Sequence, residues 1–190
     1  MSNAVSAMQG ASFKGSLHVQ DAGLQGMITL RGDLNADALI SAVKSVTGAD
    51  MPGIGKIRSG KKGATAWMSP DELLLLVGHD QADAIVAKLD TALSGTHVLA
   101  VNVSDARAMF TLEGPVIRDV LAKGAPANLS EGAFHIGDIR RTRLGQVAVA
   151  FWLSSEKTAS VVCFRSVGEH VFNWLKSAAQ NGTTPKYYSK

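Results

Sequence analysis

The chain has 190 residues, of which 46% are hydrophobic and 18% are charged, against roughly 25% charged residues in an ordinary soluble domain. This composition excludes collagen-like, coiled-coil and disordered chains, because apolar residues are too frequent and too evenly spread. The net charge of +3 is too small for a dedicated nucleic-acid binder, unless the positive charges gather in one patch.

The first half of the chain predicts strands alternating with helices. Residues 1–24 are small and polar, and we expect them to form a flexible N-terminal arm. Further along, apolar residues spaced three and four apart indicate helices, and short apolar runs bounded by turn residues indicate strands. The predicted elements are a strand at 26–31, a helix at 36–46, a basic glycine-rich loop at 51–63, strands at 65–68 and 72–77, and a helix at 82–93.

The second half predicts a similar series of elements. Gly114-Pro115 suits a helix start, because a proline at the first helical position loses no hydrogen bond. The predicted elements are strands at 98–103 and 107–112, a helix at 115–123, a loop at 125–137, strands at 146–153 and 159–164, and a helix at 166–178. A polar tail is expected at 179–190.

The two halves resemble each other in sequence. Leu30-Arg31-Gly32 matches Leu112-Glu113-Gly114 at an offset of 82 residues (112 − 30), and Trp67 matches Trp152 at an offset of 85 (152 − 67). In both cases the matched residues precede similar predicted elements. The simplest interpretation is a duplicated strand–helix–strand–strand–helix unit, since one such unit alone would bury too small a core.

This pattern predicts an α+β fold with mainly antiparallel sheets packed with helices, because hairpin-length links join the neighbouring strands. We expect one domain over residues 25–178, with the internal repeat at about 26–95 and 98–178. Apolar runs such as the one at residues 73–77 are far shorter than the roughly 20 residues that span a bilayer. We therefore expect a soluble protein that does not bind membranes.

No residue pattern predicts an active site. Cys163 is the only cysteine, which excludes a disulfide within the chain and fits the reducing cytoplasm. It lies in an apolar strand, where a thiol is ordinarily inert. None of the five histidines has a second ligand at metal-binding spacing; they are His18, His79, His97, His135 and His170. We expect no catalytic residue and no metal site, and no cofactor-binding residue can be named.

The densest positive run is Arg140-Arg141-Thr142-Arg143. Its ordinary interpretation is a solvated strand or loop, and its functional interpretation is a contact with an acidic partner or a phosphate-bearing ligand. No aromatic residues interleave with it, which argues against nucleic acid. Trp67, Trp152 and Trp174 are expected in the core, with partner anchoring as the alternative.

A series of segments resembles the gamma subunit family of heterotetrameric sarcosine oxidase. The resemblance covers roughly residues 25–178 and is densest from 101 to 175. It departs from the family at Ala125, where a cysteine is frequent, and at Val167-Gly168, where a Phe-Ala pair is frequent. The segments are VNVSDAR at 101–107, FTLEGP at 110–115, RDVLAKG at 118–124, FHIG at 134–137, FRS at 164–166 and WL at 174–175.

A wider resemblance links the chain to the folate-binding domain of glycine-cleavage aminomethyltransferases, which implies duplicated, interlocked α+β units. The family resemblance implies an oxidase that converts sarcosine to glycine, formaldehyde and hydrogen peroxide, with tetrahydrofolate as one-carbon acceptor. It further implies that FAD, FMN, NAD and tetrahydrofolate are held by partner subunits. This chain would hold no cofactor and would be a structural partner, chiefly of the alpha subunit.

Two hypotheses follow. The first is a non-catalytic assembly subunit, whose scarce surface charge marks a neutral interface with an exposed apolar patch near aromatic or alanine-rich surfaces. Self-association of the isolated chain is open under this hypothesis. The second is a stand-alone folate-binding or one-carbon-transfer protein, in which the Arg140–Arg143 run would supply cations for a glutamate tail.

Overall fold

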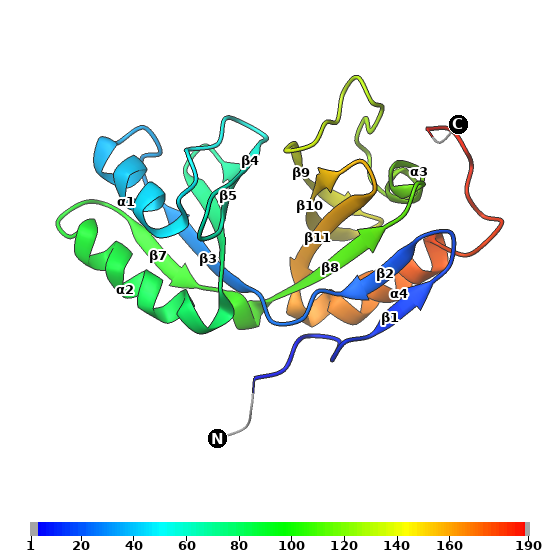
Figure 1. Cartoon of the computed structure of the whole chain (residues 1–190), viewed down its shortest axis with the longest axis horizontal. Coiled ribbons are helices and arrows are strands. Elements are labelled where there is room, and N and C mark those ends of the chain that lie inside the picture. The colour runs from blue at the N-terminus through cyan, green and yellow to red at the C-terminus, as the bar shows by residue number, and fades with distance from the viewer. Residues whose placement is uncertain (1–3, 189–190) are drawn as a thin grey trace. The chain divides into compact units, whose positions relative to one another are not determined.

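The computed structural model describes residues 4–188 (Figure 1). The chain divides into two compact units. The central unit consists of Leu24–Asp105, and the terminal unit consists of Met1–Gly23 together with Ala106–Lys190. Each unit contains one antiparallel sheet and two α-helices, so the predicted α+β class with mainly antiparallel sheets is confirmed.

The central unit is a five-stranded sheet in the order β4-β5-β6-β3-β7. Alternate residues of β3 and β6 point toward the helices. Together with the apolar faces of the helices they form one buried cluster, which includes Ile28, Leu30, Leu73 and Leu75. Removing each such side chain from water contributes about 1.5–3 kcal/mol. The elements are β3 (Gly26–Arg31), α1 (Asp37–Thr47), β4 (Ile57–Ser59), β5 (Ala64–Ser69), β6 (Glu72–Val77), the 3₁₀ turn η1 (His79–Gln81), α2 (Ala82–Ala92) and β7 (Leu99–Asn102).

The terminal unit is a six-stranded sheet in the order β1-β2-β8-β11-β10-β9. Its core gathers aromatic and aliphatic side chains, with Phe134 edge-on to Phe151 at a centroid distance of 5.7 Å. The elements are β1 (Ser12–Lys14), β2 (His18–Asp21), β8 (Arg107–Glu113), α3 (Ile117–Ala122), β9 (Ile139–Leu144), β10 (Val147–Ser155), β11 (Thr158–Phe164), the 3₁₀ turn η3 (Arg165–Val167) and α4 (Gly168–Ala178). A further 3₁₀ turn, η2 (Ser104–Ala106), precedes β8.

The two units repeat one topology. Each begins with a strand (β3 or β8) and a helix (α1 or α3), which are followed by three antiparallel strands (β4–β6 or β9–β11) and a second helix (α2 or α4). In the sheet, the first strand lies between the last of those three strands and one further strand, which is β7 in the central unit and β2 in the terminal unit. Leu30 in β3 and Leu112 in β8 occupy equivalent places, in agreement with the sequence match, because they pair with Leu73 and Ala159 respectively. The duplication is therefore present, with β4 and β9 as edge strands that the predicted unit lacked.

Two predictions about the boundaries are wrong. The strand predicted at 98–103 was placed in the second repeat, but β7 pairs with β3 in the central sheet. The arm expected over residues 1–24 includes β1 and β2, and β2 occupies the place beside β8 that β7 occupies beside β3. The sequence predicted β7 as a strand but not its partner, because pairing joins segments that are distant in sequence. β1 and β2, of three and four residues, are too short to show an alternating pattern.

Trp67 and Trp152 are not equivalent, although the sequence suggests it. Each of their strands has an irregularity, between Trp67 and Ser69 in β5 and between Leu153 and Ser155 in β10. Aligning these bulges makes Leu153 the counterpart of Trp67. Because neighbouring residues in a strand point to opposite faces, Trp152 lies on the face opposite to Leu153.

Candidate functional site

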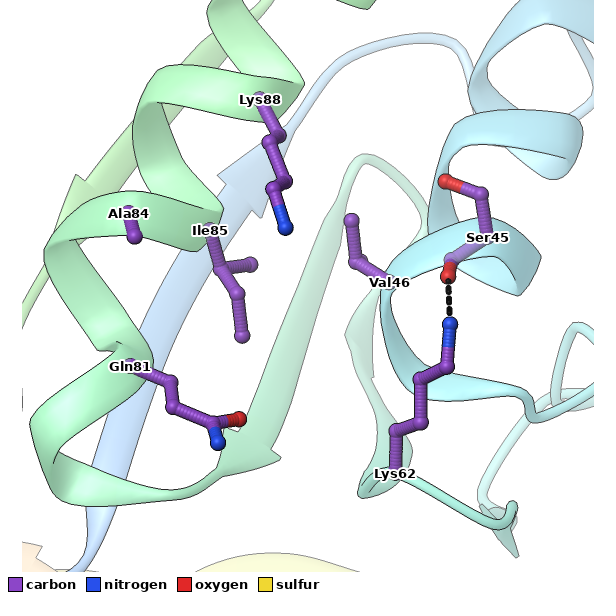
Figure 2. Close-up of a pocket in the computed structure, with 7 residues that line it drawn as sticks. All are labelled: Ser45, Val46, Lys62, Gln81, Ala84, Ile85 and Lys88. Carbon is purple, nitrogen blue, oxygen red and sulfur yellow. Dashed lines mark hydrogen bonds between the residues drawn. The ribbon is translucent and has the colours of Figure 1, made fainter.

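A groove lies between α1 and α2 of the central unit, with a volume of about 410 Å³ (Figure 2). We call it the helix groove. Residues spaced three and four apart on α2 share one face and form one wall, because such residues lie above one another on a helix. The lining residues are Ser45, Val46, Lys62, Gln81, Ala84, Ile85 and Lys88.

The helix groove combines an apolar floor with cationic walls. Val46 and Ile85 are buried and form the floor. The Lys62 ammonium donates a hydrogen bond to the Ser45 carbonyl oxygen at 3.1 Å. The side chains of Gln81, from η1, and of Lys88, from α2, extend toward the same space (Figure 2). These groups can attract an anion. Both lysines are exposed to solvent, which screens their charge and keeps such binding weak.

The polar groups that line the helix groove are one hydroxyl, two amines and one amide, from Ser45, Lys62, Lys88 and Gln81. Its seven lining residues include no carboxylate, thiol or imidazole. Proton transfer and covalent catalysis need one of these groups, or an activated hydroxyl or amine, within hydrogen-bond reach of the reacting atom. The Ser45 hydroxyl donates to the Ala42 carbonyl oxygen at 2.7 Å, and no carboxylate or imidazole of the lining lies beside it to activate it.

A second pocket, of about 650 Å³, lies at the ends of β3 and β7. We call it the edge pocket. On its rim, Arg31 forms an ion pair with the largely buried Glu72 at 2.7 Å, which fixes the guanidinium beside the sheet. The lining residues are Arg31, Gly32, Asp33, Asp71, His97, Val98 and Leu99.

The turns between the first strand and first helix of each unit are filled by the protein's own side chains. A Cβ atom placed on Gly32 would lie 2.8 Å from Val98 Cγ1, and one placed on Gly114 would lie 2.8 Å from Leu17 Cβ. Turns that cradle nucleotide phosphates leave this space open for the ligand. These two turns therefore do not fit the phosphate groups of a nucleotide cofactor.

Cys163 lies in the core of the terminal unit and is 2% exposed. In β11 it pairs with Ala108 and Val149 of the neighbouring strands. Burial raises the pKa of its thiol from 9.0 to about 11, although the nearby Arg107 acts in the opposite direction. A thiol in this state is a poor nucleophile near neutral pH.

The five histidines are dispersed over both units. His18 Nδ1 lies 3.8 Å from Glu113 Oε2, and His135 Nδ1 lies 3.4 Å from Asp138 Oδ2. Among residues 4–188, no three His, Cys, Asp or Glu side chains come together in a way that could hold a metal ion. In the same part of the chain, no helix is both long and apolar enough to cross a membrane.

The Arg140–Arg143 run is an edge strand, β9, and its arginines point to two different faces. Arg140 faces the 133–138 segment, where its guanidinium donates to the Ala133 carbonyl oxygen. The guanidinium carbon of Arg140 lies 5.1 Å from the centroid of the Phe134 ring. Arg141 and Arg143 occupy exposed positions on the other face. The run is therefore not one cationic patch, and the sequence could not show this split because it depends on strand geometry.

The three tryptophans and the glycine-rich loop pack within the fold. Trp152 is buried, whereas Trp67 and Trp174 are half-buried and Trp174 packs on the terminal core. The glycine-rich loop includes β4 and is held against the end of α1, since the Lys62 backbone N–H donates to the Thr47 carbonyl oxygen at 3.0 Å.

Sequence reasoning missed two features that bear on function. Asp119 is 1% exposed and accepts hydrogen bonds from the backbone N–H groups of Tyr187 and Tyr188, which tie down the predicted polar tail. Leu99 and Val101 are 54% and 40% exposed on one face of β7. They form an exposed apolar pair. No local signal marks it, because an edge strand is defined by its pairing.

Comparisons with known proteins give a consistent result. The model of the "Sarcosine oxidase, gamma subunit family" matches residues 31–181. The sarcosine oxidase subunit gamma of Corynebacterium sp. (strain U-96) is 29% identical over 140 residues, covering 73% of this chain and 67% of the relative. That of Arthrobacter sp is 27% identical over 147 residues, covering 76% of this chain and 71% of the relative.

Solved structures show the same likeness. A chain of the heterotetrameric sarcosine oxidase from Corynebacterium sp. U-96, in complex with pyrrole 2-carboxylate, has a TM-score of 0.78 and 26% identity, covering 88% of this chain and 87% of that one. Aminomethyltransferase T of the glycine cleavage system from Bartonella henselae has a TM-score of 0.62 and 15% identity, covering 85% of this chain and 46% of that one. The second likeness is one of fold alone.

Proposed function

Because this chain belongs to the sarcosine oxidase gamma subunit family, we propose that it is a non-catalytic assembly subunit of a heterotetrameric sarcosine oxidase. The observation that carries the proposal is the family match over residues 31–181, together with a likeness to one chain of a heterotetrameric enzyme that extends over most of both chains. The complex would oxidise sarcosine with O₂ and water, giving glycine, formaldehyde and hydrogen peroxide. Tetrahydrofolate would capture the one-carbon unit.

In this proposal the larger subunits hold FAD, FMN, NAD and tetrahydrofolate, and this chain binds chiefly the alpha subunit. The filled turns at Gly32 and Gly114 support the assignment of nucleotide cofactors to the partners. The chemically inert thiol of Cys163 and the lining of the helix groove support a role in assembly. Scarce surface charge fits a chain that buries neutral surface against a partner.

The alternative, a stand-alone folate-binding or one-carbon-transfer protein, required the Arg140–Arg143 run to gather cations for a glutamate tail. The run divides its arginines between two faces of β9. Arg140 is already engaged with the 133–138 segment. We do not favour this alternative.

Co-expression tests the proposal. The chain is produced with and without the other subunits of the heterotetramer from the same organism, and the products are separated by gel filtration. We expect the chain to elute with the other subunits and its omission to lower the yield or stability of active oxidase. Elution as a separate species, with oxidase yield and stability unchanged by omission, would contradict the proposal.

The non-catalytic role has its own measurement. Lys62→Ala and Lys88→Ala remove the cations of the helix groove without disturbing its buried floor. In the assembled complex, we expect peroxide formation per flavin to be the same as for the wild type. A tenfold lower turnover in a fully assembled complex would place this chain in the catalytic machinery.

A further inference from the structure

The central sheet ends in a strand, β7, that is covered on one face by α2, where Asn102 Nδ2 donates to Asp83 Oδ1 at 2.7 Å, but has a strand partner along one edge only. β7 pairs with β3 on one side, and no strand formed by residues 4–188 pairs with its other side (Figure 1). In the terminal sheet the equivalent strand is β2, and β1 covers the outer side of β2. The terminal sheet therefore has an additional strand, β1, at this edge, and the central sheet has none at the equivalent edge.

The equivalence of the two edges can be followed residue by residue. The offset of 82 that relates Leu30 to Leu112 also relates β3 to β8 throughout. Since Leu30 pairs with Ala100 and Leu112 pairs with Val19, Ala100 corresponds to Val19. In the terminal sheet, Phe13 of β1 pairs with Val19. The open edge thus lacks a residue opposite Ala100, where the terminal unit has Phe13.

Backbone groups on the open edge of β7 point outward. The Val103 N–H donates to the Met27 carbonyl oxygen at 2.8 Å, so Val103 faces β3. Backbone groups alternate in direction along an antiparallel strand, and Ala100 and Asn102 therefore face away from β3. Asp21, the counterpart of Asn102, uses its outward N–H to donate to the Ala11 carbonyl oxygen at 2.8 Å.

The other sheet edges carry charged side chains within the strand, whereas β7, which is also short at four residues, carries none. Short edge strands and charged side chains are the usual protections. β1 has three residues and Lys14, β4 has three residues and Arg58, and β9 carries three arginines. β7 has the sequence LAVN, with no charge, proline or bulge, and exposes Leu99 and Val101.

We propose that the open edge of β7 is the docking site for an extended segment of a partner subunit, which adds antiparallel as a sixth strand of the central sheet. The proposal rests on the assembly role proposed above and names the surface that performs it. The segment would run along β7 as β1 runs along β2, with main-chain hydrogen bonds to Ala100 and Asn102.

The chemistry of the segment follows from the surface. The residue opposite Ala100 would be apolar, as Phe13 is opposite Val19, because Ala100 packs against the core beneath the helices. The residues opposite Leu99 and Val101 would share their exposed apolar face. Beyond the Leu99 end, the next side chain of the segment would reach the edge pocket, which Leu99 helps to line.

A second copy of this chain is the competing occupant of the edge. Two copies each carry a net charge of +3, and like net charges oppose association. In the terminal unit the strand equivalent to β7 is β2, and it pairs with a short separate strand, β1, rather than with a copy of itself. A short segment is therefore the occupant that the repeat suggests for β7. We therefore assign the edge to a partner subunit.

Two substitutions test the docking site in the co-expressed complex. Ala100→Pro removes an outward N–H without removing a hydrogen bond to β3. Val101→Lys places a charge on the exposed face of the edge. The matched control is Ser59→Lys, at an exposed position on β4, the opposite edge of the same sheet. Urea unfolding of each isolated variant establishes that it folds like the wild type.

We expect both β7 variants to lower the amount of this chain that elutes with the partner subunits by at least tenfold, while Ser59→Lys elutes as the wild type does. Hydrogen exchange of the wild type supplies a second measurement that needs no substitution. Amides in peptides spanning 99–102 should exchange at least tenfold more slowly in the complex than in the isolated chain, and those spanning 57–59 should be unchanged.

The outcomes separate this inference from the proposed function. If the wild type and both β7 variants co-elute equally and 99–102 gains no protection, the docking site is wrong and the assembly role stands. If the wild type itself does not co-elute, the assembly role and the docking site both fail. If the isolated wild type is a dimer that Val101→Lys converts to a monomer, a second copy occupies the edge and the partner assignment is overturned.

Discussion

The buried carboxylate of Asp119, on α3, accepts a hydrogen bond from the backbone N–H of Tyr187 at 2.8 Å. The same oxygen accepts a second hydrogen bond from Tyr188 at 3.0 Å. Nearby, the Lys123 ammonium donates to Thr183 Oγ1 at 2.8 Å. These contacts join the C-terminal tail to the terminal unit.

Replacing Asp119 with alanine should release the tail. Loss of a buried acceptor and its two hydrogen bonds should lower the free energy of unfolding by about 1–3 kcal/mol. Urea unfolding measures the loss, and limited proteolysis should cleave faster near Tyr187. Asp90→Asn, at an exposed position on α2, is the control and should change neither. An Asp119→Ala chain as stable and as protease-resistant as the control would contradict the anchoring role.

Gly60→Ala should be strongly destabilising. A Cβ atom at Gly60 would lie 2.2 Å from the Ala49 backbone nitrogen and 2.5 Å from the Thr47 carbonyl oxygen. Backbone atoms cannot yield as a flexible side chain can, so we expect a loss of about 1–3 kcal/mol. Gly53→Ala, in the same loop, is the matched control because the nearest atom would be 3.9 Å away. Equal urea midpoints for the two variants would show that the loop does not pack against α1.

Cys163 should make stability fall at alkaline pH. The folded-state pKa of about 11 lies above the ordinary value of 9.0, so above pH 9 the unfolded chain loses its thiol proton first and is favoured. Between pH 9 and pH 11 this linkage should remove about 2–3 kcal/mol, and below pH 9 it has no effect.

The measurement for Cys163 is the difference between the wild type and Cys163→Ala in urea unfolding across that pH range, which cancels the titration of other groups. The wild type should lose its advantage as the pH rises. Ellman's reagent should modify the native thiol much more slowly than the thiol in urea. Rapid modification of the folded protein at pH 8 would show that the thiol is accessible and ionised.

Arg118 should stabilise the terminal unit through the 125–137 segment. Its guanidinium donates to the carbonyl oxygens of Leu129 and Phe134 at 2.9 and 2.7 Å. We expect Arg118→Leu to lower the free energy of unfolding by about 1–3 kcal/mol, because it leaves these oxygens without their donor. Arg143→Leu, at an exposed position on β9, is the control and should change it by less than about 0.5 kcal/mol. Comparable losses for the two variants would reject the distinction between an anchoring and a surface arginine.

Local patterns in the sequence predicted much of the fold. Helical spacing of apolar residues identified α1, α2 and α4, and apolar runs identified β5, β6, β10 and β11. The segments from 101 to 175 were sufficient to recognise the family, since a run of matching residues needs no tertiary information. The candidate surface was predicted as a neutral, apolar exterior near aromatic or alanine-rich surfaces, without named residues.

Tertiary structure decided which strands pair and which edge stays open. β2 and β7 have four residues each, and their places beside β8 and β3 depend on main-chain hydrogen bonds between segments distant in sequence. Pairing of β9 with β10 places Arg140 on the face opposite to Arg141 and Arg143, and pairing of β7 with β3 leaves Leu99 and Val101 exposed. Spacing along a chain encodes which face of an element is apolar, whereas the neighbour that covers that face is settled only when the whole chain has folded.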